Sequence, residues 1–392
     1  MENFNFYAPT YFAFGKDRES DCGELVKRFG GSKVLLHYGG GSVIRSGLLD
    51  RVKASLEKAS IEYIELGGVK PNPRSGLVYE GIDLCRKNGI DFILAVGGGS
   101  VIDSSKAIAA GTVYDGDFWD FYEGKSVEKA LPIGTVLTIS AAGSEGSPDS
   151  VITKEEGMLK RGASGEAYRP KFSILNPALT QTLPAYQTAC GITDIIAHLY
   201  ERYLTNSKDV EVTDRMIEAL ILAMVHEGPK AVADADDYES RANIMWGGMM
   251  AHNNSCGVGR SQDWTSHTIE HELSALYDCA HGAGLAVTMP AVFTYTMNHD
   301  VMRFAKIAVR VWGCQMDFDH PEVTAAAGIE ALRNFLISIG MPKNFEELGA
   351  KEEDIEKLAY TCCYGDGSGS GKVCGFTTLT QEDVEAIYRL ML

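Results

Sequence analysis

The feature that most constrains this chain is an apolar run at residues 91–96 (DFILAV) that leads straight into Gly97, Gly98, Gly99 and Ser100. A helical pattern begins immediately afterwards, near Val101. Glycine allows a sharp turn without Cβ atoms in the way, and the N–H groups at the start of a helix bind anions. The segment predicts a strand that turns into a helix around a phosphate, although a tight turn without a ligand remains the alternative for this segment alone.

A second turn of the same kind follows residues 33–38 (KVLLHY), where residues 39–41 are glycines and Ser42 comes next. Two such turns at the ends of neighbouring strands suit a dinucleotide that crosses a switch point of a parallel sheet. Proteins that select NAD usually place a carboxylate on the ribose 2′-OH, and residues 39–42 contain none, while Arg45 follows closely. We therefore expect NADP(H) to be preferred over NAD(H).

Strand-like and helical stretches alternate over the first 183 residues, and the second half is almost entirely helical in pattern. The expected strands are residues 33–38, 61–66, 91–96, 133–139 and 171–175, and the expected helices include 47–58, 74–87, 185–203, 208–233, 238–253 and 263–277. Alternation of this kind predicts a mostly parallel sheet with helices on both faces. We expect an α/β, Rossmann-like dinucleotide-binding domain over residues 1–183 and an all-helical domain over residues 184–392.

The overall charge and the cysteines exclude several classes of function. Lys and Arg number 36 against 53 Asp and Glu, which gives 36 − 53 = −17 for the 392-residue chain. An acidic surface repels nucleic acid and anionic lipid, so we expect neither as a partner. The N-terminus shows no signal-peptide pattern, and nine scattered cysteines without a CxxC pair suit a reducing compartment. We expect a cytoplasmic protein.

Histidines and one aspartate in the second half are spaced for a metal site. Asp194 and His198 are four residues apart, His267 and His271 are four apart, and His281 opens a glycine-supported helix. Spacing of four puts both members on one helical face. A lone histidine is usually a packing or surface group, but an aspartate among isoleucines would be costly to bury without a compensating charge. The cluster therefore predicts a divalent metal, for which imidazole and carboxylate ligands suit Fe(II), Zn(II), Ni(II), Co(II) or Mn(II).

These motifs, taken in order, resemble the iron-containing (group III) alcohol dehydrogenase family, above all its butanol dehydrogenase and broad-range aldehyde reductase branch. The resemblance runs from end to end. It is carried by FYAPTYFAFGK, YGGGS, GVKPNPR, DFILAVGGGSVIDSSKAIAAG, LTISAAGSE, RPKFSILNP, GITDIIAHLYE, DYESRANIMW, HTIEHELSALYD and AHGAGLAV. One departure is that Ala141-Ala142-Gly143 stands where some members have Thr-Gly, which leaves open which hydroxyl meets the pyrophosphate.

The resemblance implies a metal in the cleft between the two domains and assigns roles to individual residues. The implied ligands of one Fe(II) or Zn(II) ion are Asp194, His198, His267 and His281. His271 matches a histidine near the nicotinamide and is the expected catalytic residue, with a packing role as its alternative. The implied cofactor contacts are Gly39, Gly40, Ser42, Asn72, Gly97, Gly98, Gly99, Ser100, Asp103, Thr138, Ser147 and Lys160. Glycine at position 39 matches members that use NADP(H).

The expected reaction is hydride transfer between the nicotinamide and a small aliphatic aldehyde or primary alcohol, such as butanal or butanol. The expected substrate neighbours are Trp246, Met249, Met250, Asn253, Asn254 and Tyr364. A sister-branch polyol or glycerol-type dehydrogenase is the alternative, but its substrates favour more Lys and Arg near the metal than residues 186–300 supply. A metal-stabilised binding protein would not need two glycine turns. We expect the enzyme to be a homodimer.

Overall fold

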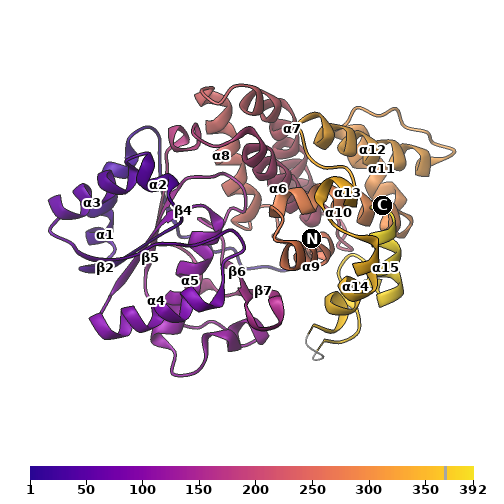
Figure 1. The fold of residues 1–392 in the computed structure, drawn as a ribbon. Helices are drawn as coiled ribbons and strands as arrows, with labels where there is room; N and C mark the ends of the chain where they lie inside the picture. Colours follow the sequence, from indigo (N-terminus) through magenta and orange to yellow (C-terminus); the bar gives the residue numbers. More distant parts are fainter. Residues whose placement is uncertain (366–368) are drawn as a thin grey trace. The chain divides into compact units, whose positions relative to one another are not determined.

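The computed structural model describes residues 1–365 and 369–392 and contains two compact units (Figure 1). The α/β unit comprises Tyr7–Leu183 and Gly248–Asn253. The helical unit comprises Met1–Phe6, Pro184–Gly247 and Asn254–Leu392. The boundary expected after residue 183 separates these units except for two short segments. The first six residues belong to the helical unit, and residues 248–253, at the end of one long helix, belong to the α/β unit.

A six-stranded sheet with the order β1-β8-β5-β4-β2-β3 forms the centre of the α/β unit, and every neighbouring pair is parallel. Its strands are β1 (Tyr11–Phe14), β2 (Lys33–Tyr38), β3 (Glu62–Leu66), β4 (Phe92–Gly97), β5 (Ile133–Leu137) and β8 (Phe172–Leu175). The five expected strands are all present, with ends shifted by two residues at most. The predicted fold class is confirmed, and the carboxyl ends of the strands meet at one edge of the sheet.

Helices cover both faces of this sheet (Figure 1). They are α1 (Cys22–Arg28), α2 (Ser42–Arg45), α3 (Leu48–Lys58), α4 (Ser75–Asn88) and α5 (Gly99–Val113). Phe92 and Leu94 of β4 pack in one apolar cluster with α1 and α3, whereas Ile93 packs in the other with α4 and α5. Because β4 is buried on both faces, its sequence is continuously apolar rather than alternating.

Among the elements of the α/β unit without a counterpart in the expected strands and helices is an antiparallel hairpin of β6 (Asp149–Lys154) and β7 (Leu159–Ser164). Its strands carry charged and small residues and show no clear apolar alternation, so periodicity could not reveal it. The hairpin is tied to the body of the unit by the N–H of Thr153, which donates to the main-chain oxygen of Pro73 at 2.8 Å.

The helical unit is built around α6, which is buried from Thr188 to its end. The helices of the unit are α6 (Ala185–Tyr203), α7 (Glu211–Ala233), α8 (Tyr238–His252), α9 (Thr265–Tyr277), α10 (His281–Thr296), α11 (Val301–Arg310), α12 (Pro321–Ser338), α13 (Phe345–Leu348), α14 (Ile355–Tyr364) and α15 (Gln381–Arg389), with a small ladder of β9 (Val373–Cys374) and β10 (Thr378–Leu379). α6 packs against α7 and α10, and α10 also packs against α9. Within the described residues, none of the helices has the length and apolar character required to cross a bilayer.

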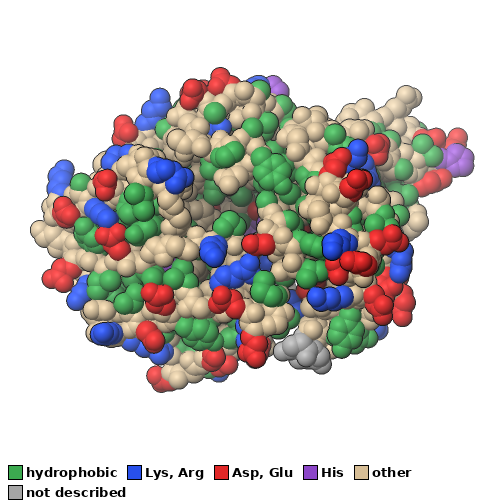
Figure 2. All heavy atoms as spheres, viewed as in Figure 1, with side chains coloured by type: hydrophobic (Ala, Val, Ile, Leu, Met, Phe, Trp, Pro, Cys, Tyr) green, Lys and Arg blue, Asp and Glu red, His purple; other side chains and the backbone are tan. Residues whose placement is uncertain are grey.

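Charged side chains of both signs are distributed over the face drawn in Figure 2, where Asp and Glu alternate with Lys and Arg. No single large acidic patch dominates the described residues on this face, although the whole chain carries a net charge of −17. Interspersed charges of this kind keep a protein soluble without creating a strong single-sign field.

Candidate functional site

Three helices of the helical unit bring the expected metal ligands together. Asp194 and His198 lie one turn apart on α6, His267 lies on α9, and His281 is the first residue of α10. Asp194 and His198 are each 4 % exposed and His267 is 7 % exposed, whereas the His281 side chain is 25 % exposed. Three members of the cluster are thus buried, and His281 is the most exposed of the four.

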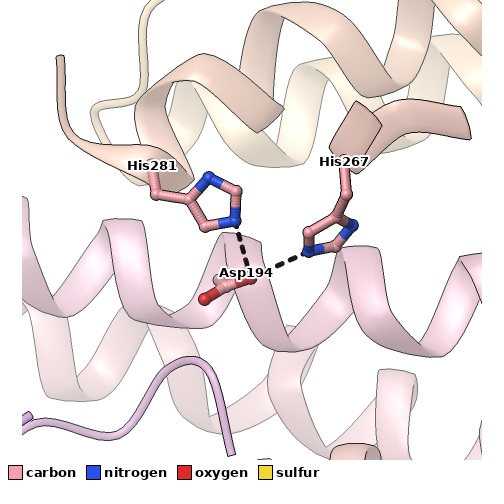
Figure 3. A group of neighbouring side chains, drawn as sticks. All are labelled: Asp194, His267 and His281. Atoms are coloured by element: carbon pink, nitrogen blue, oxygen red, sulfur yellow. Dashed lines mark ion pairs between the residues drawn. The ribbon is translucent and has the colours of Figure 1, made fainter. Parts of the chain in front are cut away.

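Three imidazole nitrogens converge on a single carboxylate oxygen. Oδ1 of Asp194 lies 3.7 Å from Nε2 of His198 and 3.5 Å from Nε2 of His267. The same oxygen lies 3.8 Å from Nε2 of His281, and Figure 3 shows His267 and His281 turned toward it. These separations exceed hydrogen-bond lengths. Two ligands at about 2.1 Å from one ion, at a tetrahedral angle, lie about 3.4 Å apart, so the donors fit a shared divalent metal.

The charge around His267 also favours a cation. Burial by itself lowers the pKa of His267, but the carboxylates of Glu201 and Asp194 outweigh it and raise the pKa to about 10. Glu270 is a third buried carboxylate, in contact with His281. Three buried carboxylates are costly unless positive charge compensates them. A divalent ion at Oδ1 of Asp194 would supply that charge.

His198 lies at the margin of the cluster. Asp194, His267 and His281 offer ligand atoms that all lie within 4.8 Å of one another, and His198 is not in that set. Its ring stacks on the ring of His267, with centroids 4.6 Å apart. His198 therefore approaches the same carboxylate oxygen from the side of His267 rather than from the side of His281.

His271 lies next to the expected metal site but outside the Asp194 group. It is one turn beyond His267 on α9, and their ring centroids are 6.3 Å apart. Its ligand atom groups with those of Glu270 and His281 instead. The structure thus separates His271 from the group that surrounds Asp194.

Two buried carboxylates at this site, Glu201 and Glu270, were not singled out in the sequence. Glu201 accepts a hydrogen bond from the N–H of His267 at 3.0 Å and also contacts its Nδ1. Glu270 contacts Nδ1 of His281. Helical spacing could have revealed Glu201, which lies seven residues after Asp194 on the same face of α6. No spacing could reveal Glu270, because its partner is on another helix.

The expected phosphate turns lie side by side in the α/β unit. Strands β2, β4 and β5 are parallel neighbours, so residues 39–42 after β2, residues 97–100 after β4 and Thr138 after β5 share one edge of the sheet. Gly98 has no room for a side chain, since a Cβ there would lie 2.1 Å from Cγ2 of Ile139. Helix α5 begins directly after it, with its N-terminal N–H groups at this edge. The arrangement fits a pyrophosphate.

Asp103 and Ser147, two expected cofactor contacts, belong to a buried network around Lys106. The carboxylate of Asp103 accepts hydrogen bonds from Oγ of Ser144 at 2.6 Å and from a main-chain N–H of β6 at 3.0 Å. The acceptors of the fully buried Lys106 ammonium include the main-chain oxygens of Ser144 (2.8 Å), Ser147 (3.1 Å) and Asp149 (2.6 Å). One oxygen of Asp103 therefore binds the loop between β5 and β6, and the other binds strand β6 itself.

The β6–β7 hairpin brings Lys160 near Asn72. Lys160 pairs across the ladder with Thr153, whose N–H donates to the oxygen of Pro73. Asn72 adopts a left-handed conformation, with φ 52°, which asparagine tolerates better than most residues. Both side chains are buried. Two expected contacts that are far apart in sequence are thus close in the fold.

The expected substrate neighbours divide between the two units. Met249, Met250 and Asn253 belong to the α/β unit, and Trp246, Asn254 and Tyr364 belong to the helical unit. Met249 is 2 % exposed, and its Cγ lies 3.4 Å from the position of a Cβ on Gly146. Met249 therefore packs in the core of the α/β unit.

Glu145 gives the loop between β5 and β6 a testable pH dependence. Burial raises the pKa of its carboxyl from 4.5 to about 7. The folded state then holds a proton that the unfolded chain has lost, so the free energy of unfolding falls as the pH rises between these values. Glutamine at this position does not titrate. At about 1.4 kcal/mol per pKa unit, the free energy of unfolding of Glu145→Gln should therefore rise by about 3 kcal/mol relative to that of the wild type between pH 4.5 and pH 8, as measured by urea unfolding. For Glu128→Gln, which replaces an exposed residue, the difference in unfolding free energy from the wild type should be the same at both pH values. The same result for Glu145→Gln would contradict the predicted role of this buried carboxyl.

Known proteins match the chain over almost its whole length. Residues 9–177 match the iron-containing alcohol dehydrogenase family, and residues 188–392 match the Fe-containing alcohol dehydrogenase family, C-terminal. NADH-dependent butanol dehydrogenase A of Clostridium acetobutylicum is 40% identical over 391 residues, 99% of each chain. NADPH-dependent aldehyde reductase YqhD of Escherichia coli is 35% identical over 362 residues, 91% of this chain and 92% of the relative.

A solved structure is similar at the same level. The crystal structure of NADH-dependent butanol dehydrogenase A from Thermotoga maritima superimposes with a TM-score of 0.96 at 40% identity, and covers 100% of this chain and 99% of that one. Similarity of this extent includes both the sheet and the helical half. The chain therefore belongs to the iron-containing alcohol dehydrogenase family, a family of oxidoreductases that act on CH–OH donors with NAD(P) and a divalent metal.

Proposed function

We propose that this chain reduces small aliphatic aldehydes such as butanal to primary alcohols, and runs the reverse oxidation, at an Fe(II) or Zn(II) ion held by Asp194, His198, His267 and His281. The observation that carries the proposal is the convergence of three Nε2 atoms on Oδ1 of Asp194, at 3.5 to 3.8 Å. A divalent metal bound there supplies Lewis acidity toward a carbonyl oxygen. The names of the relatives, butanol dehydrogenase and aldehyde reductase, support the substrate class.

The chain's own residues bind and orient the reactants. The turns at residues 39–42 and 97–100, with the N-terminus of α5, receive the pyrophosphate of the cofactor. His271 lies beside His281, with ring centroids 5.7 Å apart, and outside the Asp194 group. We therefore assign His271 to holding a proton on a ring nitrogen near the substrate oxygen rather than to coordination.

The turn after β2 supports NADP(H) as the preferred cofactor. Residues 39–42 carry no carboxylate for a ribose 2′-OH, and Arg45 follows the turn closely in the sequence. The position of a Cβ on Gly41 would lie 2.3 Å from Nη1 of Arg45, which places the guanidinium directly against this turn. Among the relatives, one with 40% identity is named NADH-dependent and one with 35% is named NADPH-dependent, so their names favour neither cofactor.

The cofactor preference is tested by steady-state kinetics with butanal and either NADPH or NADH, after the apo-protein is loaded with Fe(II) or Zn(II). We expect the higher kcat/KM with NADPH. Arg45→Gln should lower kcat/KM for NADPH about tenfold, because a charge-assisted hydrogen bond contributes about 1.5–3 kcal/mol, and should leave NADH within about twofold. A higher kcat/KM with NADH in the wild type would refute the preference, and faster oxidation of glycerol than of butanol would favour the polyol alternative.

A further inference from the structure

Glu201 holds His267 at two points. Its side chain is fully buried on α6. Oε1 accepts the main-chain N–H of His267 at 3.0 Å, and Oε2 contacts the ring at Nδ1. One carboxylate therefore fixes both the start of α9 and the orientation of the imidazole. A histidine whose Nδ1–H donates to a carboxylate presents Nε2 with its lone pair free.

Glu270 contacts His281 at one point, Nδ1 of the ring, and this contact joins two helices. Glu270 is fully buried on α9, and its Oε2 contacts Nδ1 of His281 at the start of α10. A Cβ on Gly284 would lie 2.5 Å from Oε1 of Glu270. Glycine at that position of α10 therefore leaves the room that this carboxylate occupies.

We infer that Glu201 and Glu270 are positioning residues for the metal, each holding the Nδ1 side of one histidine so that its Nε2 faces the ion bound by Asp194. The inference rests on the proposed function, since it assumes that this cluster is the metal site. Carboxylates that hold metal-binding histidines in this way typically change metal affinity about 10–100-fold when they are replaced. Their effect is therefore measurable without any enzymatic assay.

Glutamine is the informative replacement because it keeps the size of the side chain and removes one acceptor. In Glu201→Gln, either the N–H or the Nδ1 of His267 faces an amide NH2 group. If the amide donates to Nδ1, the ring proton moves to Nε2, and that nitrogen is no longer a ligand. In Glu270→Gln, His281 loses a charged partner that raises the basicity of its ring.

The test is titration of the metal-free full-length protein with Co²⁺, read by visible absorption and by competition with a chelator. We expect Glu201→Gln and Glu270→Gln each to weaken Co²⁺ binding about 10–100-fold and to alter the absorption bands. Glu218→Gln is the matched control, because Glu218 is also buried in the helical unit but pairs with Arg215 and Arg310. Its Co²⁺ affinity should stay within about twofold of the wild type.

Each outcome decides the inference. Glutamine variants that bind Co²⁺ as tightly as the wild type would overturn it, even if their melting temperatures fall by as much as that of Glu218→Gln. Should Glu201→Gln fail to fold, Glu270→Gln alone decides. Asp194→Ala distinguishes failure of the proposed metal site from failure of the positioning role of Glu201 and Glu270. If Asp194→Ala retains its Co²⁺ affinity, the proposed metal site and the inference both fail. If it loses Co²⁺ while the glutamine variants keep it, only the inference fails.

Discussion

Replacement of His267 by alanine is expected to remove the metal and to lower kcat/KM for butanal by at least about 1,000-fold. Lewis-acid stabilisation of the developing alkoxide contributes several kcal/mol, and each 1.36 kcal/mol corresponds to a factor of ten in rate. His267 contacts two of the other three proposed ligands, since it lies 3.5 Å from Oδ1 of Asp194 and stacks on His198. Metal content per chain and steady-state kinetics measure both effects.

Two other histidines serve as comparisons for this variant. His271→Ala should retain one metal per chain, because His271 lies outside the Asp194 group, although its activity should fall. The exposed His226→Ala should retain both metal and activity. A His267→Ala protein with a full complement of metal would contradict the ligand assignment. Loss of metal in His271→Ala would show that the division between coordination and catalysis is wrong.

The second large effect is expected for Lys106→Met, which should lower the free energy of unfolding by about 3–5 kcal/mol. Burial lowers the pKa of Lys106 to about 8, so at pH 7 the side chain is still a charged donor. Without it, the main-chain oxygens of Ser144, Ser147 and Asp149 lose a buried partner, and Asp103 loses its nearest positive charge. Because this loop carries Ser147, we also expect weaker NADPH binding, measured by fluorescence titration.

Lys87→Met provides the matched control, since Lys87 is an exposed lysine of α4 in the same unit. Its unfolding free energy should change by less than about 0.5 kcal/mol. Urea unfolding of both variants at pH 7 gives the comparison. If Lys106→Met were as stable as Lys87→Met, the buried network would not be what fixes the loop between β5 and β6.

Periodicity predicted most of the fold because the decisive segments have one clear pattern each. The run at β4 is apolar throughout since it is buried on both faces, and α6 was predicted with the bounds that the structure has, Ala185–Tyr203. The β6–β7 hairpin has no such pattern, so its existence depends on tertiary contacts such as that of Thr153 with Pro73. The local sequence pattern cannot predict such contacts, because they join residues that are far apart in the chain.

Spacing in the sequence predicted the pairs of site residues that share a helix, whereas the grouping of ligands from three helices came from the family resemblance. Spacing of four brought Asp194 together with His198, but the contact between Glu270 and His281 joins different helices. Asp103 stays a predicted cofactor contact, and sequence could not show that its carboxylate also accepts a hydrogen bond from Ser144 in the loop after β5. The homodimer, the cytoplasmic location and the roles of the individual site residues stay predictions.

The central claim is that one divalent ion, bound at Asp194, is required for aldehyde reduction. Titration of the metal-free protein with Fe(II) under anaerobic conditions, or with Zn(II), tests it most directly, with NADPH oxidation by butanal followed at each addition. The account predicts that activity rises from near zero and reaches its plateau at one equivalent per chain, and that Asp194→Ala does not respond. Full activity in the metal-free wild type, or the same titration curve for Asp194→Ala, would contradict it.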